Sequence, residues 1–128
     1  RWLGHAEKDR STITMLVPVQ YQRLMDFDGL EDCDLSSLTL KYCTSAPFSA
    51  ELKREVLARM PGGLIEIYSM TEGGVVCLLE CHKFPDKLHT VGRPAPGSEL
   101  KVLDDEDRLV PAGEAGNLIG LSHTMMSG

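Results

Sequence analysis

The stretch LTLKYCTSAPFSAELKREVLARMPGGLIEIY, residues 38–68, decides the fold of this chain. Residues 38–43 alternate large apolar and smaller or polar side chains, which is typical of a β-strand with two unlike faces. Residues 49–60 carry a helical pattern, Pro61-Gly62-Gly63 ends it, and Leu64 to Tyr68 starts a second strand. A strand, a helix and a strand with short connections predict two parallel strands joined by a right-handed crossover.

The helix in the middle of this stretch has a clear start and a clear buried face. Ser49 is a suitable N-cap, and Glu51 lies in the positive first turn. Glu55 and Arg59 have the spacing of a surface ion pair. The predicted apolar stripe consists of Leu52, Val56, Leu57 and Met60.

Outside this stretch, further elements follow on both sides. Thr12 to Val17 reads as a strand, and Pro18 to Met25 as a helix that begins with proline. Gly92 to Gly97 forms a stiff, turn-rich connector, after which Glu99 to Asp104 and Asn117 to Ser122 alternate like strands.

These elements together predict an α/β fold class. A parallel-sheet layer with flanking helices is expected over residues 1–91. A small antiparallel β subdomain is expected over residues 92–128, and it is expected to be incomplete.

Composition excludes several classes of function. The net charge of −6 in 128 residues argues against a nucleic-acid surface, which needs clustered cations. The longest apolar run, Val75 to Leu79, is too short for a transmembrane segment, and no signal-peptide pattern is present. We therefore expect a cytoplasmic protein.

The cysteines and histidines do not form a recognisable site. Cys77, Cys81 and His82 suggest a metal corner, but a fourth ligand at a sensible spacing is missing. We expect the four cysteines to be reduced thiols. The four histidines lie at no spacing that indicates a nucleophile relay.

Two segments follow the carboxyl ends of the two central strands, where open α/β sheets bind ligands. They are Thr44 to Pro47 and Ser69 to Gly74. Neighbouring parallel strands would bring these segments side by side, so that one ligand touches both.

The second segment has the residue types that a nucleotide and its metal need. Thr71 offers a hydroxyl to a phosphate, Glu72 is an oxygen ligand that Mg²⁺ accepts, and Tyr68 offers an aromatic face to a base. The alternative from the residues alone is a polar surface turn after an ordinary core tyrosine. Neither a Walker A motif nor G-x-G-x-x-G is present.

Several motifs resemble one family. Tyr68-Ser69-Met70-Thr71-Glu72 resembles the Y-G-x-T-E motif of adenylate-forming enzymes, the family of acyl-CoA synthetases, luciferases and peptide-synthetase adenylation domains. Four more segments are similar to family motifs in the same order: Leu16–Pro18 to V-P, Thr44–Ser49 to G-G-A-P-L-S, His89–Gly97 to V-G-x-P-x-P-G, and Gly116–Leu118 with Met125–Gly128 to G-E-L and M-x-G-Y. The resemblance covers nearly the whole chain from about Thr12.

The resemblance implies a nucleotide site on the two segments. Ser45, Ala46 and Pro47 would line the adenine of ATP or AMP, and Tyr68 would stack on it. Ser69 and Met70 would border the acyl pocket.

The resemblance also implies the reaction. Thr71 would hold the α-phosphate and Glu72 would bind Mg²⁺, which makes them the catalytic pair. A small carboxylic acid attacks the α-phosphorus of ATP, which gives an acyl-adenylate and pyrophosphate. A thiol, usually that of CoA, then displaces AMP. The resemblance is strongest to an acid–CoA ligase, as in fatty acid metabolism; carrier-protein loading is a variant.

The chain departs from the family at several positions of these motifs. Ser45 and Ser69 stand where glycines are common, Asn117 replaces a common glutamate, and Leu121-Ser122 replaces the usual Arg-Gly. The lysine-ending phosphate loop, the ribose-binding aspartate and the C-terminal domain are absent from these 128 residues. We therefore expect a fragment that is inactive alone, with its partners in the N- and C-terminal parts of a parent enzyme, and with possible self-association through its sheet edge.

Two further hypotheses stay open beside the acid–CoA ligase. One is a nucleotide-binding or interaction domain that kept the fold and lost catalysis. The other is a generic α/β domain with accidental motifs.

Overall fold

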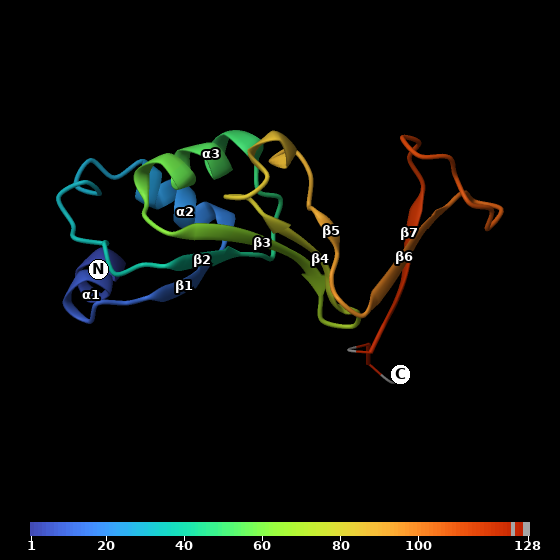
Figure 1. Cartoon of the computed structure of the whole chain (residues 1–128), viewed down its shortest axis with the longest axis horizontal. Helices are drawn as coiled ribbons and strands as arrows, with labels where there is room; N and C mark the ends of the chain where they lie inside the picture. The colour runs from blue at the N-terminus through green and yellow to red at the C-terminus, as the bar shows by residue number, and fades with distance from the viewer. Residues whose placement is uncertain (124, 127–128) are drawn as a thin grey trace.

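A computed structural model of the chain describes residues 1–123 and 125–126 (Figure 1). Its elements, in chain order, are α1 (Trp2–Lys8), β1 (Ile13–Leu16), α2 (Pro18–Met25), β2 (Leu40–Cys43), α3 (Ala50–Arg59), β3 (Gly63–Met70), β4 (Gly74–Glu80), the 3₁₀ turn η1 (Pro85–Lys87), β5 (Arg93–Pro94), β6 (Ser98–Leu103) and β7 (Asn117–Ser122).

The larger sheet has five strands in the order β1-β2-β3-β4-β5. β1, β2 and β3 are parallel neighbours, and β4 and β5 are added antiparallel to them. The predicted strand–helix–strand unit is therefore confirmed, with β2 and β3 side by side. The mixed character of the sheet comes from β4, which returns directly from β3 as a hairpin.

The smaller sheet consists of β6 and β7, paired antiparallel from Ser98↔Ser122 to Leu103↔Asn117. It lies at the opposite end of the long axis from α1 (Figure 1). Both strands were predicted within one residue at each end. The predicted α/β fold class, with a small antiparallel sheet after the main layer, is confirmed.

The core lies between the larger sheet and the helices α2 and α3, which cover the same side of it (Figure 1). Tyr21 from α2, Val56 from α3 and Leu64 from β3 are fully buried there. The hydroxyl of Tyr21 donates to the carbonyl oxygen of Tyr42 over 2.9 Å, which satisfies the one polar group that this ring brings into the core.

Helix α3 forms as the sequence predicts. The hydroxyl oxygen of Ser49 accepts from the backbone N–H of Leu52 at 3.2 Å, so Ser49 is the N-cap. Glu55 and Arg59 form the expected ion pair at 2.9 Å. The predicted stripe is incomplete, because Lys53 is buried on the same face.

A second buried lysine, Lys41, binds the connection between α3 and β3. Lys41 in β2 donates from Nζ to the carbonyl oxygens of Met60, Pro61 and Gly62, at 3.2, 2.6 and 2.7 Å. These carbonyl groups belong to the residues that follow the last residue of α3 and lead into β3. The three hydrogen bonds compensate a buried charge that the strand pattern did not predict.

Several elements differ from the sequence prediction, and strand β4 was not predicted. Helix α1 was not predicted; it forms because Leu3 and Ala6 pack one face into the core. The loop predicted over Ser69 to Gly74 is shorter, since Ser69 and Met70 belong to β3 and Gly74 already belongs to β4. Gly74 adopts φ +68°, a conformation that favours glycine, and this allows the tight turn.

None of the helices that the structure describes has both the length and the apolar character needed to cross a membrane.

Candidate functional site

The two predicted ligand segments meet at the carboxyl ends of β2 and β3. The hydroxyl groups of Thr44 and Ser69 lie 3.3 Å apart, within hydrogen-bond distance. The parallel pairing of β2 and β3 is the cause, because it places both strand ends on one edge of the sheet. One ligand can therefore contact both segments.

A pocket of about 340 Å³ opens between these segments, and we refer to it as the first pocket. It contains five of the residues predicted to bind nucleotide or acid, together with three that were not predicted. Its lining consists of Ser45, Ala46, Pro47, Tyr68 and Ser69, with Glu66, Ile67 and Val91.

Ser45 has an unusual backbone in the wall of this pocket. Its φ is +78°, in the left-handed region that favours glycine. The resemblance placed a family glycine at this position. The local fold thus keeps the conformation suited to glycine although the residue is serine, at a cost of order 1–2 kcal/mol.

Thr71 and Glu72 lie outside the first pocket. Both are exposed, and they form the β3–β4 turn with Gly73. The backbone carbonyl of Glu72 accepts from the N–H of Met126 over 2.9 Å, so the segment after β7 contacts this turn. The Ser127 and Gly128 part of the predicted M-x-G-Y motif lies outside the described residues.

Glu72 is the predicted metal ligand. Within the described part of the chain, no group of three or more histidine, cysteine, aspartate or glutamate side chains is placed to hold a metal ion. Mg²⁺ in nucleotide sites is commonly bound by one or two carboxylates, with phosphates and water as its other ligands. A single exposed carboxylate at the turn fits that kind of site.

Met70 lines a different, apolar cavity of about 130 Å³, the second pocket. This pocket lies between the β3–β4 hairpin and the smaller sheet, and its walls include Gly73, Leu100, Leu118 and Leu121. Tyr68 lines both pockets. The two residues predicted for the acyl side are therefore separated, with Ser69 at the first pocket and Met70 at the second.

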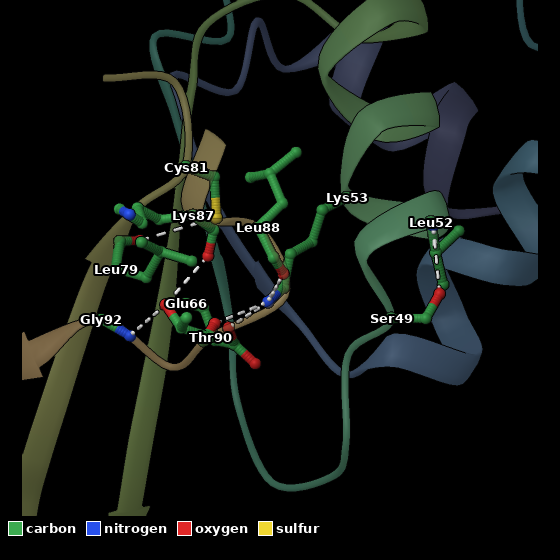
Figure 2. Close-up of polar contacts among 10 residues, drawn as sticks. All are labelled: Ser49, Leu52, Lys53, Glu66, Leu79, Cys81, Lys87, Leu88, Thr90 and Gly92. Atoms are coloured by element: carbon green, nitrogen blue, oxygen red, sulfur yellow. Dashed lines mark hydrogen bonds and ion pairs between the residues drawn. The ribbon is translucent and has the colours of Figure 1, made fainter. Parts of the chain in front are cut away.

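Glu66 is the site residue that the sequence analysis missed. Its side chain lines the first pocket and is 7% exposed, and its Oε2 atom lies 2.5 Å from Nζ of Lys53 (Figure 2). Two features of the sequence could have identified this pair. Lys53 precedes Val56 by three residues, which places it on the buried face of the helix. Glu66 follows Leu64 by two residues in β3, so both side chains point to the buried face of the sheet.

The Lys53 amine has further partners. It donates to the carbonyl oxygens of Leu88 at 2.8 Å and Thr90 at 3.1 Å, and it lies 5.7 Å from the centre of the Phe48 ring (Figure 2 shows the two carbonyls). A buried ammonium group is stable only with such compensation.

Burial dominates the electrostatics around this ion pair. Loss of hydration raises the pKa of Glu66, while the neighbouring Lys53 ammonium lowers it. Burial, with Glu66 nearby, raises the pKa of Cys43 to about 12, and burial raises that of Cys81 to about 11. These thiols are therefore protonated and unreactive at neutral pH, as free cysteines.

Asn117 lines neither pocket, and its amide nitrogen donates to Asp105 over 3.2 Å. A glutamate at this position would place two carboxylates together. The departure from the family motif at Asn117 therefore has a local structural reason.

The family of this chain follows from its sequence as well as its fold. The family model of the AMP-binding enzymes matches residues 1–128, and the chain belongs to this family of adenylate-forming ligases.

Individual proteins that are similar to this chain support the same family. The chain is 36% identical to the 2,3-dihydroxybenzoate-AMP ligase of Bacillus subtilis (strain 168) over 118 residues, and 34% identical to the 2-hydroxy-7-methoxy-5-methyl-1-naphthoate–CoA ligase of Streptomyces carzinostaticus over 116 residues. Each match covers 88% of this chain and 21% of the relative. The amide bond synthetase McbA from Marinactinospora thermotolerans superposes with a TM-score of 0.90 at 29% identity, over 99% of this chain and 26% of its own. The chain thus spans about a fifth to a quarter of these proteins.

Proposed function

We propose that this chain is the central part of an ATP-dependent enzyme that activates an aromatic carboxylic acid as its acyl-adenylate. The observation that carries the proposal is the first pocket, which gathers Ser45, Ala46, Pro47 and Tyr68 from two separate segments of a chain in the AMP-binding family. We call the larger protein that contains this chain the parent protein.

In this proposal, the first pocket binds the adenine of ATP. The backbone of Ser45, Ala46 and Pro47 forms one wall, and the ring of Tyr68 stacks on the base from the other side. Tyr68 is 39% exposed, which leaves part of its ring accessible to a ligand.

The turn between β3 and β4 then handles the phosphates. Thr71 donates its hydroxyl to the α-phosphate, and Glu72 binds Mg²⁺ through its carboxylate. Both side chains are exposed, and they follow Ser69, which lines the first pocket, by two and three residues. Mg²⁺ neutralises phosphate charge, and the turn holds the α-phosphorus in position for attack by the carboxylate.

The acid lies between Ser69 and Met70 in this proposal. The second pocket offers an apolar wall to a ring, and the two curated relatives reported above are named for benzoate and naphthoate acids. For the second step we propose transfer to CoA. The relatives differ here, since their names describe an AMP ligase, a CoA ligase and an amide bond synthetase.

A second candidate function is nucleotide binding without catalysis. Ser45 favours it, because a hydroxymethyl group now stands where a glycine would let the adenine approach the backbone. This candidate keeps the first pocket as an ATP or AMP site and abandons the acyl transfer.

The test is carboxylate-dependent ATP–pyrophosphate exchange by the parent protein, across aromatic, short-chain and long-chain acids. We expect exchange with aromatic acids, and a loss of about 10²–10³-fold in the Glu72→Ala variant because a group that stabilises the transition state is removed. Glu114→Ala, which removes an exposed carboxylate that lines neither pocket, is the matched control. Nucleotide binding without exchange for any acid would favour the non-catalytic domain.

A further inference from the structure

The first pocket is built from three segments that are far apart in the sequence. Residues 45–47 precede α3, residues 66–69 belong to β3, and Val91 follows η1. No backbone hydrogen bond between 45–47 and the segment at residue 91 appears among those recorded for the described residues. Pairing of β2 with β3 positions residues 45–47 against β3, whereas side-chain contacts join residues 45–47 to the segment at residue 91.

Lys53 contacts Glu66 in β3 and also contacts a residue directly next to each of the other two segments. Its Nζ lies 2.5 Å from Oε2 of Glu66, 3.1 Å from the carbonyl oxygen of Thr90, next to Val91, and 5.7 Å from the ring of Phe48, which directly follows Pro47. The side chain is 2% exposed, so these contacts are held in a closed interior.

Resting on the proposed function, we infer that Lys53 is a positioning residue for nucleotide binding. Its ammonium group fixes the spacing of the three walls of the first pocket without contacting the nucleotide. It also holds Glu66, which does line the pocket, in one orientation. Loss of Lys53 therefore weakens ATP binding more than binding of the acid.

The chain offers a matched control for this inference. Lys41 is equally buried and also binds carbonyl oxygens, but it does so at the far end of α3, at Met60, Pro61 and Gly62. It lines neither pocket. Lys41→Met removes a buried lysine that packs near the end of α3, and it leaves the contacts of Lys53 at the first pocket unchanged.

The main variant is designed to fold. Lys53→Met alone leaves the Glu66 carboxylate buried without its counter-charge, so the double variant Lys53→Met/Glu66→Gln is compared with Glu66→Gln. The difference between these two isolates Lys53 from any effect of Glu66 on the ligand. The groups that face Glu66 are Lys53 from α3, Cys43 from β2 and Cys81 after β4, and the two thiols are unchanged in every variant.

The experiment measures the Kd of ATP for the parent protein, and the KM values of ATP and of the acid in ATP–pyrophosphate exchange. We expect the double variant to bind ATP at least about fivefold more weakly than Glu66→Gln, with the KM of the acid within twofold, since the contacts of Lys53 lie at the first pocket and the ring of the acid lies in the second. Lys41→Met should leave the Kd of ATP within twofold.

Three results would overturn the inference. The first is an equal Kd of ATP for the double variant and for Glu66→Gln. The second is an equal rise in the KM of ATP and the KM of the acid in the double variant. The third is a loss of ATP binding in Lys41→Met as large as that in the double variant. If the double variant does not fold, Lys53→Arg decides, because its larger planar group disturbs the same contacts and should weaken ATP binding; unchanged binding refutes the inference.

The same measurements test the proposed function separately from the role of Lys53. A parent protein that binds ATP without exchange refutes the proposed adenylation, and the Kd values then still decide the role of Lys53. A parent protein that does not bind ATP refutes both.

Discussion

Ser45 shows at the residue scale how this chain departs from its family without losing the fold. Its φ of +78° is strained for serine and ordinary for glycine. The neighbouring Ala46 is not among the residues with positive φ. We therefore expect substitution by glycine to have opposite effects on stability at these two positions.

We expect Ser45→Gly to stabilise the parent protein by about 0.5–1 kcal/mol, because relief of the strained φ outweighs the extra freedom of the unfolded chain. Ala46→Gly should destabilise it by about 0.5–1 kcal/mol, since only the entropy cost remains. Thermal unfolding of both variants is the measurement. A fall in Tm for Ser45→Gly equal to that for Ala46→Gly would contradict the prediction.

The Lys53–Glu66 pair makes a second prediction at the residue scale. The Lys53→Met variant should lose about 3–5 kcal/mol of stability, because it leaves a buried carboxylate without its partner. The pKa of Glu66 is raised above its ordinary value of 4.5 by burial. Its contribution to stability is therefore fully present below pH 4.5 and is lost as the pH rises through the raised pKa.

Removing Lys53 takes away the group that lowers this pKa, so the loss of stability in Lys53→Met should be larger at pH 7 than at pH 5. Lys41→Met is the control. Burial lowers the pKa of Lys41 to about 8, so this lysine is protonated in both states between pH 5 and 7. Thermal unfolding at the two pH values tests this, and an equal Tm deficit for Lys53→Met at both would count against a buried ionised pair.

At the scale of elements, the connection from η1 to β5 depends on one glycine. Gly92 has φ +88°, and a Cβ there would lie 1.9 Å from the carbonyl oxygen of Leu78 in β4. Gly113 has φ +95°, but no heavy atom lies within 4 Å of its Cβ position. The two positions separate backbone strain from a steric clash.

We expect Gly92→Ala to cost about 3 kcal/mol or more, because strain adds to a clash that pushes β5 away from β4. Gly113→Ala should cost about 1–2 kcal/mol from strain alone. The two Tm values of the parent protein are the measurement. Similar losses in both variants would show that the β4 contact is unimportant.

Element by element, much of the layout was predictable from local patterns. The helix after Ser49 and both strands of the smaller sheet follow from capping and alternation. Helix α1 was not predicted, because it depends on the packing of Leu3 and Ala6 into the core. Strand β4 was not predicted although it pairs with β3 through a local turn, because residues 75–79 form an apolar run without alternation. The predicted division into residues 1–91 and 92–128 stays a proposal.

At the scale of the whole molecule, the larger sheet is covered on one side only. In β1, Thr14 and Leu16 are buried, whereas Ile13 and Met15 are each 58% exposed. This chain spans about a quarter of McbA, with which it shares its fold. We propose that other segments of the parent protein cover this apolar face.

We predict that the 128-residue chain alone catalyses no carboxylate-dependent ATP–pyrophosphate exchange. The chain offers the walls of the first pocket for the adenine and the separate β3–β4 turn for the phosphates, and a nucleotide needs groups on its other sides for productive positioning. Exchange assays on the chain and on the parent protein, at equal concentration, test this. Turnover by the chain alone would refute it.

The sequence by itself determined the family, the strand–helix–strand unit, the smaller sheet and five residues of the first pocket, because these are properties of local patterns and of motifs in order. Only the tertiary structure decided that Lys53 and Glu66 form a buried pair behind that pocket, that Ser69 and Met70 face different cavities, and that Ser45 keeps a left-handed backbone. The physical reason is that burial and pairing depend on which strands and helices become neighbours. A charged residue at a position of ambiguous periodicity turns inward only when a partner from another element meets it there.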